Sequence, residues 1–180
     1  MRAFLALPVP EALWDPLGSI QDRIKAGRRV DEEDLHLTIA FLDDQHPDAL
    51  EALHEELEAR ALPRVEIRPA ALAVFGSRKP RLLALDCEAT PPLTALHDAA
   101  RSAARMAGIA LPRARFRPHV TLARFGRLAP DEAARIAAAL ARLPDAGLPD
   151  PVPAERLTLY SSTLTESGPI YEPLAEYPLG

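Results

Sequence analysis

Two stretches of the chain, HLTIAFLDDQHPDALEALHEEL over residues 36–57 and HVTLARFGRLAPDEAARIAAAL over residues 119–140, align with each other without a gap. Each begins with a His-x-Thr triplet, continues as an apolar run, and reaches a Pro-Asp pair followed by a helical pattern. The offset is 119 minus 36, or 83 residues, and it also relates Pro47 to Pro130. A duplicated unit is the simplest cause of this repeat.

The size and composition of the chain exclude several classes of protein. It has 180 residues, of which 48% are hydrophobic, enough for one domain or two closely packed half-domains. No run reaches the roughly 18 apolar residues of a membrane span. The N-terminal MRAFLALPVPEALW is too short and too interrupted by proline for a signal peptide. We therefore expect a monomeric, cytoplasmic protein with no membrane segment.

The cysteine count and the charge distribution limit the chemistry further. The single cysteine, Cys87, rules out an internal disulfide and a cysteine-based zinc site, and we expect a buried thiol. The net charge of −5 argues against a general nucleic-acid coat, yet arginines gather around the second His-x-Thr. They are Arg113, Arg115, Arg117, Arg124 and Arg127. We expect at least one to face phosphate, because the guanidinium offers phosphate oxygens a planar fork of donors.

The hydrophobic periodicity predicts alternating strands and helices. Strands are expected over residues 2–7, 35–42, 65–75, 81–87, 116–125, 156–164 and 169–179. Helices are expected over residues 11–25, with a bend near Pro16, and over 47–59, 92–106 and 130–143. The third and fourth strands read as a hairpin across GSRKP, and strands from the two chain ends are expected to complete the sheets of the two repeats. This order predicts one α+β domain over residues 1–180, built of two similar lobes.

Strand geometry gives the repeated His-x-Thr a possible purpose. Side chains at i and i+2 point to the same face of a strand, so His36 shares a face with Thr38, and His119 with Thr121. The residues between them point the other way, into each lobe's core. Two lobes related by a pseudo-twofold axis would then present a pair of imidazoles and a pair of hydroxyls to each other.

Such a pair of imidazoles suits attack on phosphorus. Near neutral pH one ring can accept a proton from water while the other donates one to the departing oxygen. Threonine hydroxyls and nearby arginines would stabilise the charge that develops on the non-bridging oxygens. This division of work needs no metal.

Other site types find less support in the sequence. A metal site needs three or four ligands, but the next residues expected on the same face are Ala40 and Ala123. The remaining histidines, His46, His54 and His97, do not repeat. The chain has no G-x-S-x-G elbow, no Walker phosphate loop and no G-x-G-x-x-G. Serine hydrolase and P-loop chemistry are therefore unsupported.

Nearly the whole chain resembles the 2H phosphoesterase superfamily, specifically the bacterial RNA 2′,3′-cyclic phosphodiesterases, also called 2′-5′ RNA ligases. The segments that carry the resemblance, in the family's order, are FLAL with VP, DLHLTIAFL, VFGSRKPRLLAL, FRPHVTLARF and LTLYSSTLTESGPIYEPLAEYPL. It implies two mainly antiparallel sheets flanked by helices, around a central cleft that carries both His-x-Thr motifs. It also implies metal-independent and cofactor-independent hydrolysis of 2′,3′-cyclic phosphate ends of RNA or small nucleotides to 2′-phosphomonoesters, with possible reverse 2′-5′ ligation.

By the same resemblance His36 and His119 are the acid/base pair, and Thr38, Thr121 and Arg124 bind the substrate phosphate. The symmetry of the repeat does not decide which histidine is the acid; we start from His36 as the acid and His119 as the base. Arg124 requires a bend or a bulge, because strand alternation alone points it away from His119.

The first repeat has Phe41 where the second has Arg124, so any arginine contribution is asymmetric. Base stacking by Phe41, Phe125, Tyr160 or Tyr171 is possible, but core packing is the default expectation for aromatic side chains.

Two other functions remain open from sequence. One is a nucleotide-binding or RNA-end-binding module that holds phosphate between the histidines without turning it over. The other is a purely structural duplication, which predicts neither binding nor turnover.

Overall fold

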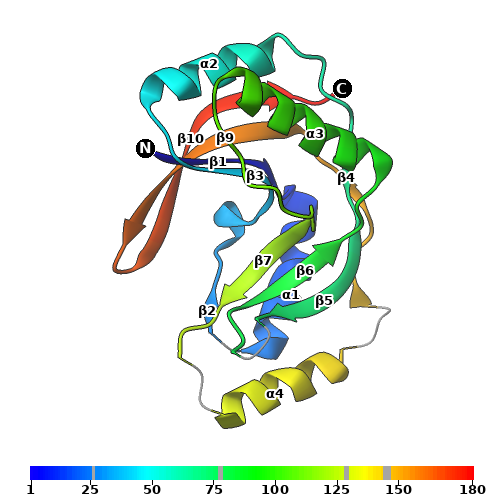
Figure 1. Cartoon of the computed structure of the whole chain (residues 1–180). Coiled ribbons are helices and arrows are strands. Elements are labelled where there is room, and N and C mark those ends of the chain that lie inside the picture. Colours follow the sequence, from blue (N-terminus) through cyan, green and yellow to red (C-terminus); the bar gives the residue numbers. More distant parts are fainter. Residues whose placement is uncertain (26, 77–78, 128–129, 144–146) are drawn as a thin grey trace.

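The computed structural model describes residues 1–25, 27–76, 79–127, 130–143 and 147–180, and it confirms an α+β fold (Figure 1). The strands are β1 (Arg2–Pro8), β2 (Arg28–Arg29), β3 (His36–Asp44), β4 (Glu66–Ile67), β5 (Pro69–Phe75), β6 (Leu82–Cys87), β7 (His119–Arg124), β8 (Val152–Pro153), β9 (Arg156–Thr165) and β10 (Gly168–Pro178). The helices are α1 (Trp14–Ile24), α2 (Pro47–Glu58), α3 (Pro91–Met106) and α4 (Pro130–Ala141), with short 3-10 turns η1 (Glu11–Leu13) and η2 (Glu32–Asp34).

The helices begin where the sequence signals predict. In α2 and α3 a proline occupies the first turn, where its missing N–H costs no hydrogen bond. The preceding residue caps each helix: the His46 ring accepts from the Asp48 N–H, and the Thr90 hydroxyl accepts from the Leu93 N–H. The helix predicted over residues 11–25 divides into η1 and α1, and Pro16 lies in the first turn of α1.

The two repeats supply the two central strands of the sheet. The sheet order is β10-β9-β1-β3-β7-β6-β5, and within the described residues each pair of neighbouring strands is antiparallel. The neighbouring central strands are β3, from the first repeat, and β7, from the second. Within the described residues β3 and β7 share a single residue pair, Leu37 with Val120, and both side chains are fully buried. The short strand β2 pairs with the other end of β7. The predicted antiparallel sheets are thus joined at one narrow seam.

One expectation about the chain ends was wrong. Strands from both ends join the first repeat, since β1 pairs with β3 and β9 pairs with β1 and β10. The second repeat is completed by the β5–β6 hairpin from the middle of the chain. Within the connecting GSRKP segment, residues 77–78 lie outside the described residues. The duplication explains this placement, because β6 stands to β7 as β1 stands to β3.

Each repeat is the second half of a larger strand-helix-strand-helix unit. The first unit is β1-α1-β3-α2 and the second is β6-α3-β7-α4, and each unit packs a helix against the other. Helix α1 of the first unit packs on β7 and α4 of the second, and helix α3 of the second packs on β3 and α2 of the first. Figure 1 shows α2 and α3 on the outer side of the upper sheet, with α1 and α4 about the lower one. A helix of each unit thus packs against a central strand of the other unit.

Two smaller expectations can be checked in the fold. Cys87 is buried as predicted, and burial raises the pKa of its thiol to about 12, so the thiol stays protonated. No helix within the described ranges is long and apolar enough to span a membrane.

Candidate active site

The two His-x-Thr motifs meet at the seam between the lobes. The six residues from His36 and the six from His119 alternate between partly exposed and buried in the same order, so the side chains of each motif share one face. Because Leu37 pairs with Val120 in antiparallel fashion, His36 comes across from Thr121, and Thr38 across from His119. The structure thus brings together the four residues predicted from sequence, in a two-by-two array with pseudo-twofold symmetry.

The two imidazoles are held in the same way. The Nδ1 atom of His36 lies 2.7 Å from the Asp34 carbonyl oxygen, and that of His119 lies 2.9 Å from the Arg117 carbonyl oxygen. A carbonyl only accepts hydrogen bonds, so each Nδ1 carries a proton and donates it. In the neutral ring Nε2 then bears the lone pair, and this atom of each histidine remains available for proton transfer.

Aromatic rings surround His36 on the first-lobe side. Its ring centroid lies 5.0 Å from that of Phe4, 5.2 Å from that of Tyr171 in an edge-on arrangement, and 6.3 Å from that of Tyr160. Burial lowers the pKa of His36 to about 4, the positive charges of Arg124 and His119 act in the same direction, and the bond to the Asp34 carbonyl partly opposes them. His36 is therefore neutral at physiological pH. The charges of Arg124 and His119, both from the second lobe, act on His36. Both side chains therefore lie close to His36 across the seam.

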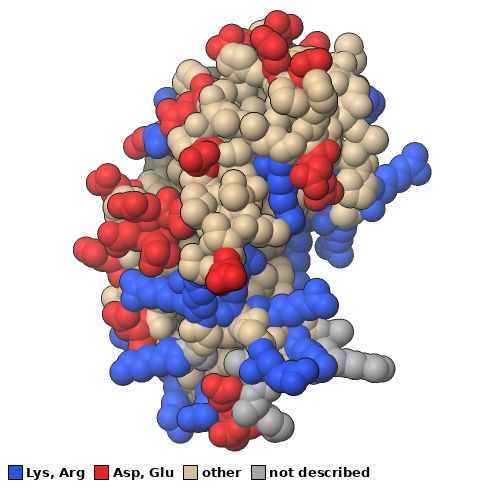
Figure 2. Space-filling model, turned by 90° about the vertical axis from the view of Figure 1, so that its left-hand side faces the viewer, with Lys and Arg blue, Asp and Glu red and all other residues tan. Residues whose placement is uncertain are grey.

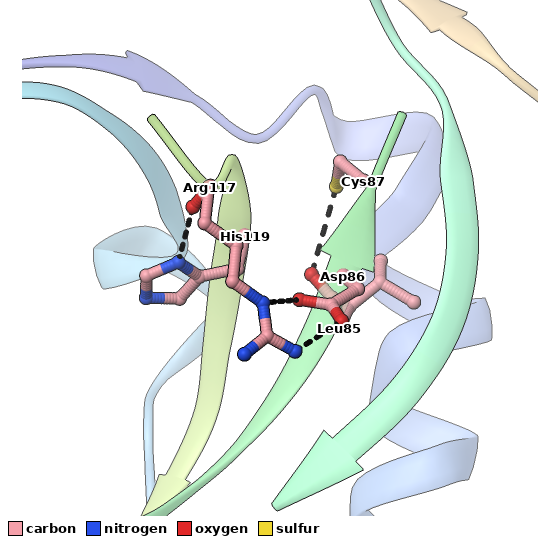
Figure 3. Close-up of polar contacts among 5 residues, drawn as sticks. All are labelled: Leu85, Asp86, Cys87, Arg117 and His119. Carbon is pink, nitrogen blue, oxygen red and sulfur yellow. Dashed lines mark hydrogen bonds and ion pairs between the residues drawn. The ribbon is translucent and has the colours of Figure 1, made fainter. Parts of the chain in front are cut away.

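The side chains around His119 differ from those around His36 (Figure 3). Arg117 donates from Nε and Nη2 to the two carboxylate oxygens of Asp86, at 3.2 and 2.7 Å. Its guanidinium lies 4.1 Å above the Phe75 ring, whose centroid is 4.6 Å from that of His119. Of the arginines gathered in sequence around the second motif, Arg117 is thus held by the protein itself, while Arg113, Arg115 and Arg127 are exposed.

Strand alternation alone would point Arg124 away from His119, but a β-bulge in each central strand changes this alternation. In β7 the register against β6 skips Leu122, and in β3 the register against β1 skips Ile39, which is the matching residue of the first repeat. The extra residue reverses the alternation beyond it. Arg124 therefore comes onto the face of His119 and Thr121, as the prediction required.

A buried glutamine holds the bulge of β7. The Gln21 side-chain amide, from α1, donates to the Leu122 carbonyl and to the Val30 carbonyl, both at 2.8 Å. The Val30 N–H also donates to the Leu122 carbonyl, at 3.0 Å. These bonds satisfy the Leu122 carbonyl, which the bulge withdraws from the ladder. Gln21, a residue of the first unit, therefore holds the bulge that directs Arg124 in the second unit.

Arg28 is a candidate phosphate ligand that the sequence analysis missed. It lies on β2 directly opposite Arg124, and no acidic partner within ion-pair distance is found for either guanidinium among the described residues. Two like charges directly opposite each other destabilise a strand pair, and a bound anion would offset this cost. Figure 2 shows Lys and Arg gathered across the lower half of the face that it presents, with a patch of Asp and Glu beside them. A two-residue strand is too short to give a periodic signal, so no pattern could have identified Arg28.

Two glycines make the approach of β2 possible. Gly27, with φ of 69°, lies so close to the Arg124 carbonyl and the Phe125 ring that a Cβ atom would clash with both. Gly168, with φ of 117°, lies against the Arg28 guanidinium at the turn between β9 and β10. Larger residues at either position would displace Arg28 from the cleft.

The threonines and the other histidines complete the picture. Within the described part of the chain, neither Thr38 nor Thr121 uses its hydroxyl in a hydrogen bond, so both hydroxyls are available to a ligand. His46 caps α2, His54 bonds the Tyr177 hydroxyl, and His97 stacks on Phe116. Over the same described ranges, no three His, Cys, Asp or Glu side chains are grouped so that they could hold a metal ion.

Comparison with known proteins identifies the family of the chain. A model of the 2′-5′ RNA ligase superfamily matches residues 9–166. The chain belongs to this superfamily. A Thermotoga maritima protein named RNA 2′,3′-cyclic phosphodiesterase is 29% identical over 98% of this chain and 94% of its own length. A Geobacillus stearothermophilus protein of the same name is 34% identical over 83% of this chain but only 47% of its own length.

Two solved structures share the fold. A Thermus thermophilus protein superposes with a TM-score of 0.78 at 25% identity, covering 99% of this chain and 98% of that one. Escherichia coli LigT in its apo form gives a TM-score of 0.76 at 24% identity, covering 99% of this chain and 96% of LigT. The superfamily resemblance predicted from the sequence is confirmed by the family model over residues 9–166.

Gln21 offers a test of the bulge. We predict that Gln21→Met, which removes both amide hydrogen bonds and leaves the Val30 carbonyl buried without its donor, lowers the free energy of unfolding by about 1–3 kcal/mol. Urea denaturation measures this. Gln45→Met is the matched control, because the Gln45 amide donates only to the Leu42 carbonyl in a partly exposed position, and it should cost less. Equal stability of Gln21→Met and the wild type would contradict this role.

The pKa of His36 offers a second test. NMR titration of the imidazole carbon-bound protons should give a midpoint near pH 4 for the signal that disappears in His36→Gln. Because an unfolded histidine titrates near pH 6.5, the unfolded chain binds more protons between pH 6.5 and 4, so stability should fall as the pH drops through this window. A midpoint above pH 6 for His36 would show that the ring is not desolvated.

Proposed function

We propose that the protein hydrolyses 2′,3′-cyclic phosphate ends of RNA or small nucleotides to 2′-phosphomonoesters. The observation that carries this proposal is the pair of histidines, one from each lobe, on one face of the seam with Nδ1 bonded to a carbonyl and Nε2 available. The names of the Thermotoga and Geobacillus relatives support the substrate class.

In the proposed reaction water attacks phosphorus and the bond from phosphorus to the 3′ oxygen breaks. One imidazole takes a proton from the water, the other gives a proton to the 3′ oxygen, and the product is a 2′-phosphate with a free 3′ hydroxyl. One water is consumed, and exchange of protons with solvent restores both histidines. The step requires the two imidazoles on opposite sides of the same phosphorus, which matches their origin in opposite lobes.

The protonation of the free protein favours His36 as the base. Its lowered pKa leaves Nε2 unprotonated at neutral pH, ready to accept the proton of water. His119, beside the partly exposed Phe75 and Arg117, is then the acid. This is the reverse of the assignment with which the sequence analysis began, and the reason is the ring of aromatic side chains around His36, which the repeat does not reveal.

The remaining residues of the site would stabilise the negative charge of the phosphate. The Thr38 and Thr121 hydroxyls would donate to the non-bridging oxygens from the two sides of the seam. Arg124, with Arg28 opposite, would stabilise the extra negative charge of the transition state. The same groups would serve the reverse reaction, the joining of ends through a 2′-5′ linkage, but the high concentration of water favours hydrolysis.

The central prediction is turnover in the presence of excess chelator and its loss in His36→Ala and His119→Ala. Each variant should lower kcat by about 10²–10⁴-fold, because each removes one proton-transfer step. Product analysis by phosphorus NMR on an RNA with a cyclic phosphate end measures this. A stable complex with no new monoester would favour the nucleotide-binding alternative, and full activity of either variant would contradict a shared site.

A sulfur substitution separates the acid from the base. In a cyclic substrate with sulfur in place of the 3′ bridging oxygen the leaving group needs no proton, so we predict that this substrate restores most of the activity of His119→Ala and none of that of His36→Ala. Single-turnover rates on both substrates measure the effect. Rescue of His36→Ala instead would restore the original assignment.

Arg124 gives a third test. Arg124→Ala should lower kcat/KM by about 10²-fold, as expected for loss of one donor to transition-state charge, and Arg124→Lys by less. The control is Arg135→Ala, since Arg135 is an exposed residue of α4 whose ion pair is with Asp131 of the same helix. Activity of Arg124→Ala equal to that of this control would place Arg124 outside the site.

A further inference from the structure

The Arg117 side chain is fixed by residues of two neighbouring strands. Its guanidinium donates to both carboxylate oxygens of Asp86, on β6, and lies 4.1 Å from the centroid of the Phe75 ring, on β5. Figure 3 shows Arg117 reaching from the segment before β7 to Asp86. A bidentate bond sets the plane of a guanidinium as well as its distance, so the Arg117 side chain is held in one orientation.

His119 meets three parts of this arrangement. It lies directly opposite Asp86 in the ladder of β6 and β7, its Nδ1 donates to the Arg117 carbonyl, and its ring centroid is 4.6 Å from that of Phe75. An imidazole bonded only through Nδ1 can still tilt about that bond. The contact with Phe75 limits the tilt, and the Arg117 cation holds Phe75 in place through its attraction to the ring face. The direction of Nε2 therefore depends on the ion pair.

The ion pair is poorly placed to stabilise the fold. The side chains of Arg117 and Asp86 are 58% and 21% exposed, and an ion pair in contact with water contributes little to stability. The offset of 83 residues makes Asp34 the counterpart of Arg117, with the opposite charge, and in that lobe aromatic rings surround His36 instead. The arrangement is thus specific to the histidine of the second lobe.

We propose that Arg117 and Asp86 are positioning residues for the proposed general acid, and that through Phe75 they hold the His119 ring with Nε2 directed at the leaving oxygen. This inference rests on the proposed function and names what prepares one of its two histidines. A direct contact of Arg117 with the substrate phosphate is less suited to the geometry. Two of its donor nitrogens already bond Asp86, and that carboxylate offsets the positive charge.

The test uses the cyclic substrate with sulfur at the 3′ bridging position, whose thiolate leaves without a proton. Arg117→Gln and Asp86→Asn should each lower kcat on the oxygen substrate by about tenfold to a hundredfold and leave KM unchanged, as expected for a misplaced catalytic group. On the sulfur substrate both variants should be as fast as the wild type, because this substrate does not need the acid. Single-turnover rates and KM on the two substrates measure the effect.

The matched control is Arg60→Gln. Arg60 forms a partly exposed ion pair with Glu56 of α2, so this variant also removes one arginine-carboxylate pair and should leave both rates unchanged. An equal loss on both substrates in Arg117→Gln would overturn the positioning role, since a general distortion or a lost phosphate contact gives that result. A wild-type rate of Arg117→Gln on the oxygen substrate would overturn it as well.

Two further measurements separate this proposal from the proposed function. The double variant Arg117→Gln/His119→Ala should be no slower than His119→Ala alone, whichever proton His119 transfers, and an additional loss would contradict the proposal. If the wild type turned over neither substrate, the proposed function would fail. The nuclear Overhauser effect between the His119 and Phe75 rings would still decide the structural claim, which requires the effect in the wild type and its loss in Arg117→Gln.

Discussion

The structure depends on a single strand pairing. Leu37 and Val120 form the one residue pair that joins β3 to β7, and through it the two lobes become a continuous sheet. The residues on either side of this pair are the histidines and threonines of the two motifs. This one pair sets the register in which the two motifs lie opposite each other.

The exchange of helices stabilises this narrow joint. Since α1 covers the sheet of the second lobe and α3 that of the first, separation of the lobes would expose the apolar faces of both. The same exchange connects the units at the level of chemistry. Gln21 of α1 holds the bulge that turns Arg124, and Arg124 in turn acts on the charge of His36. The site is therefore a property of the two repeats together.

The duplication makes the two halves of the site similar, and the different side chains around each motif make the site asymmetric. Both histidines share the same Nδ1 bond to the carbonyl two residues earlier, and both strands share the same bulge. Around this common frame the first lobe gathers Phe4, Tyr160 and Tyr171, while the second presents Arg124 and Arg28. The aromatic side lowers the pKa of His36 and ends in the exposed Phe41.

Much of this was predictable because periodicity and repetition are local signals. The strands, the helices and the shared face of His36 with Thr38 all follow from spacing in the chain. The need for a bulge before Arg124 came from the family resemblance together with strand alternation. What remained hidden depends on contacts between distant segments. The partners of the chain-end strands, the role of Gln21, the position of Arg28 on a two-residue strand and the exposure of Phe41 have no local pattern. The pKa of His36 belongs to the same group, since it depends on rings from three other strands.

The most direct measurement of the central claim is nitrogen-15 NMR of the imidazole rings during titration with adenosine 2′-phosphate. In the free protein at neutral pH His36 should show a protonated Nδ1 and an unprotonated Nε2. The account predicts that one equivalent of ligand shifts the Nε2 signals of His36 and His119 together, with the same saturation curve. A shift of only one of them, or separate curves that require two equivalents, would contradict a single phosphate held between the two lobes.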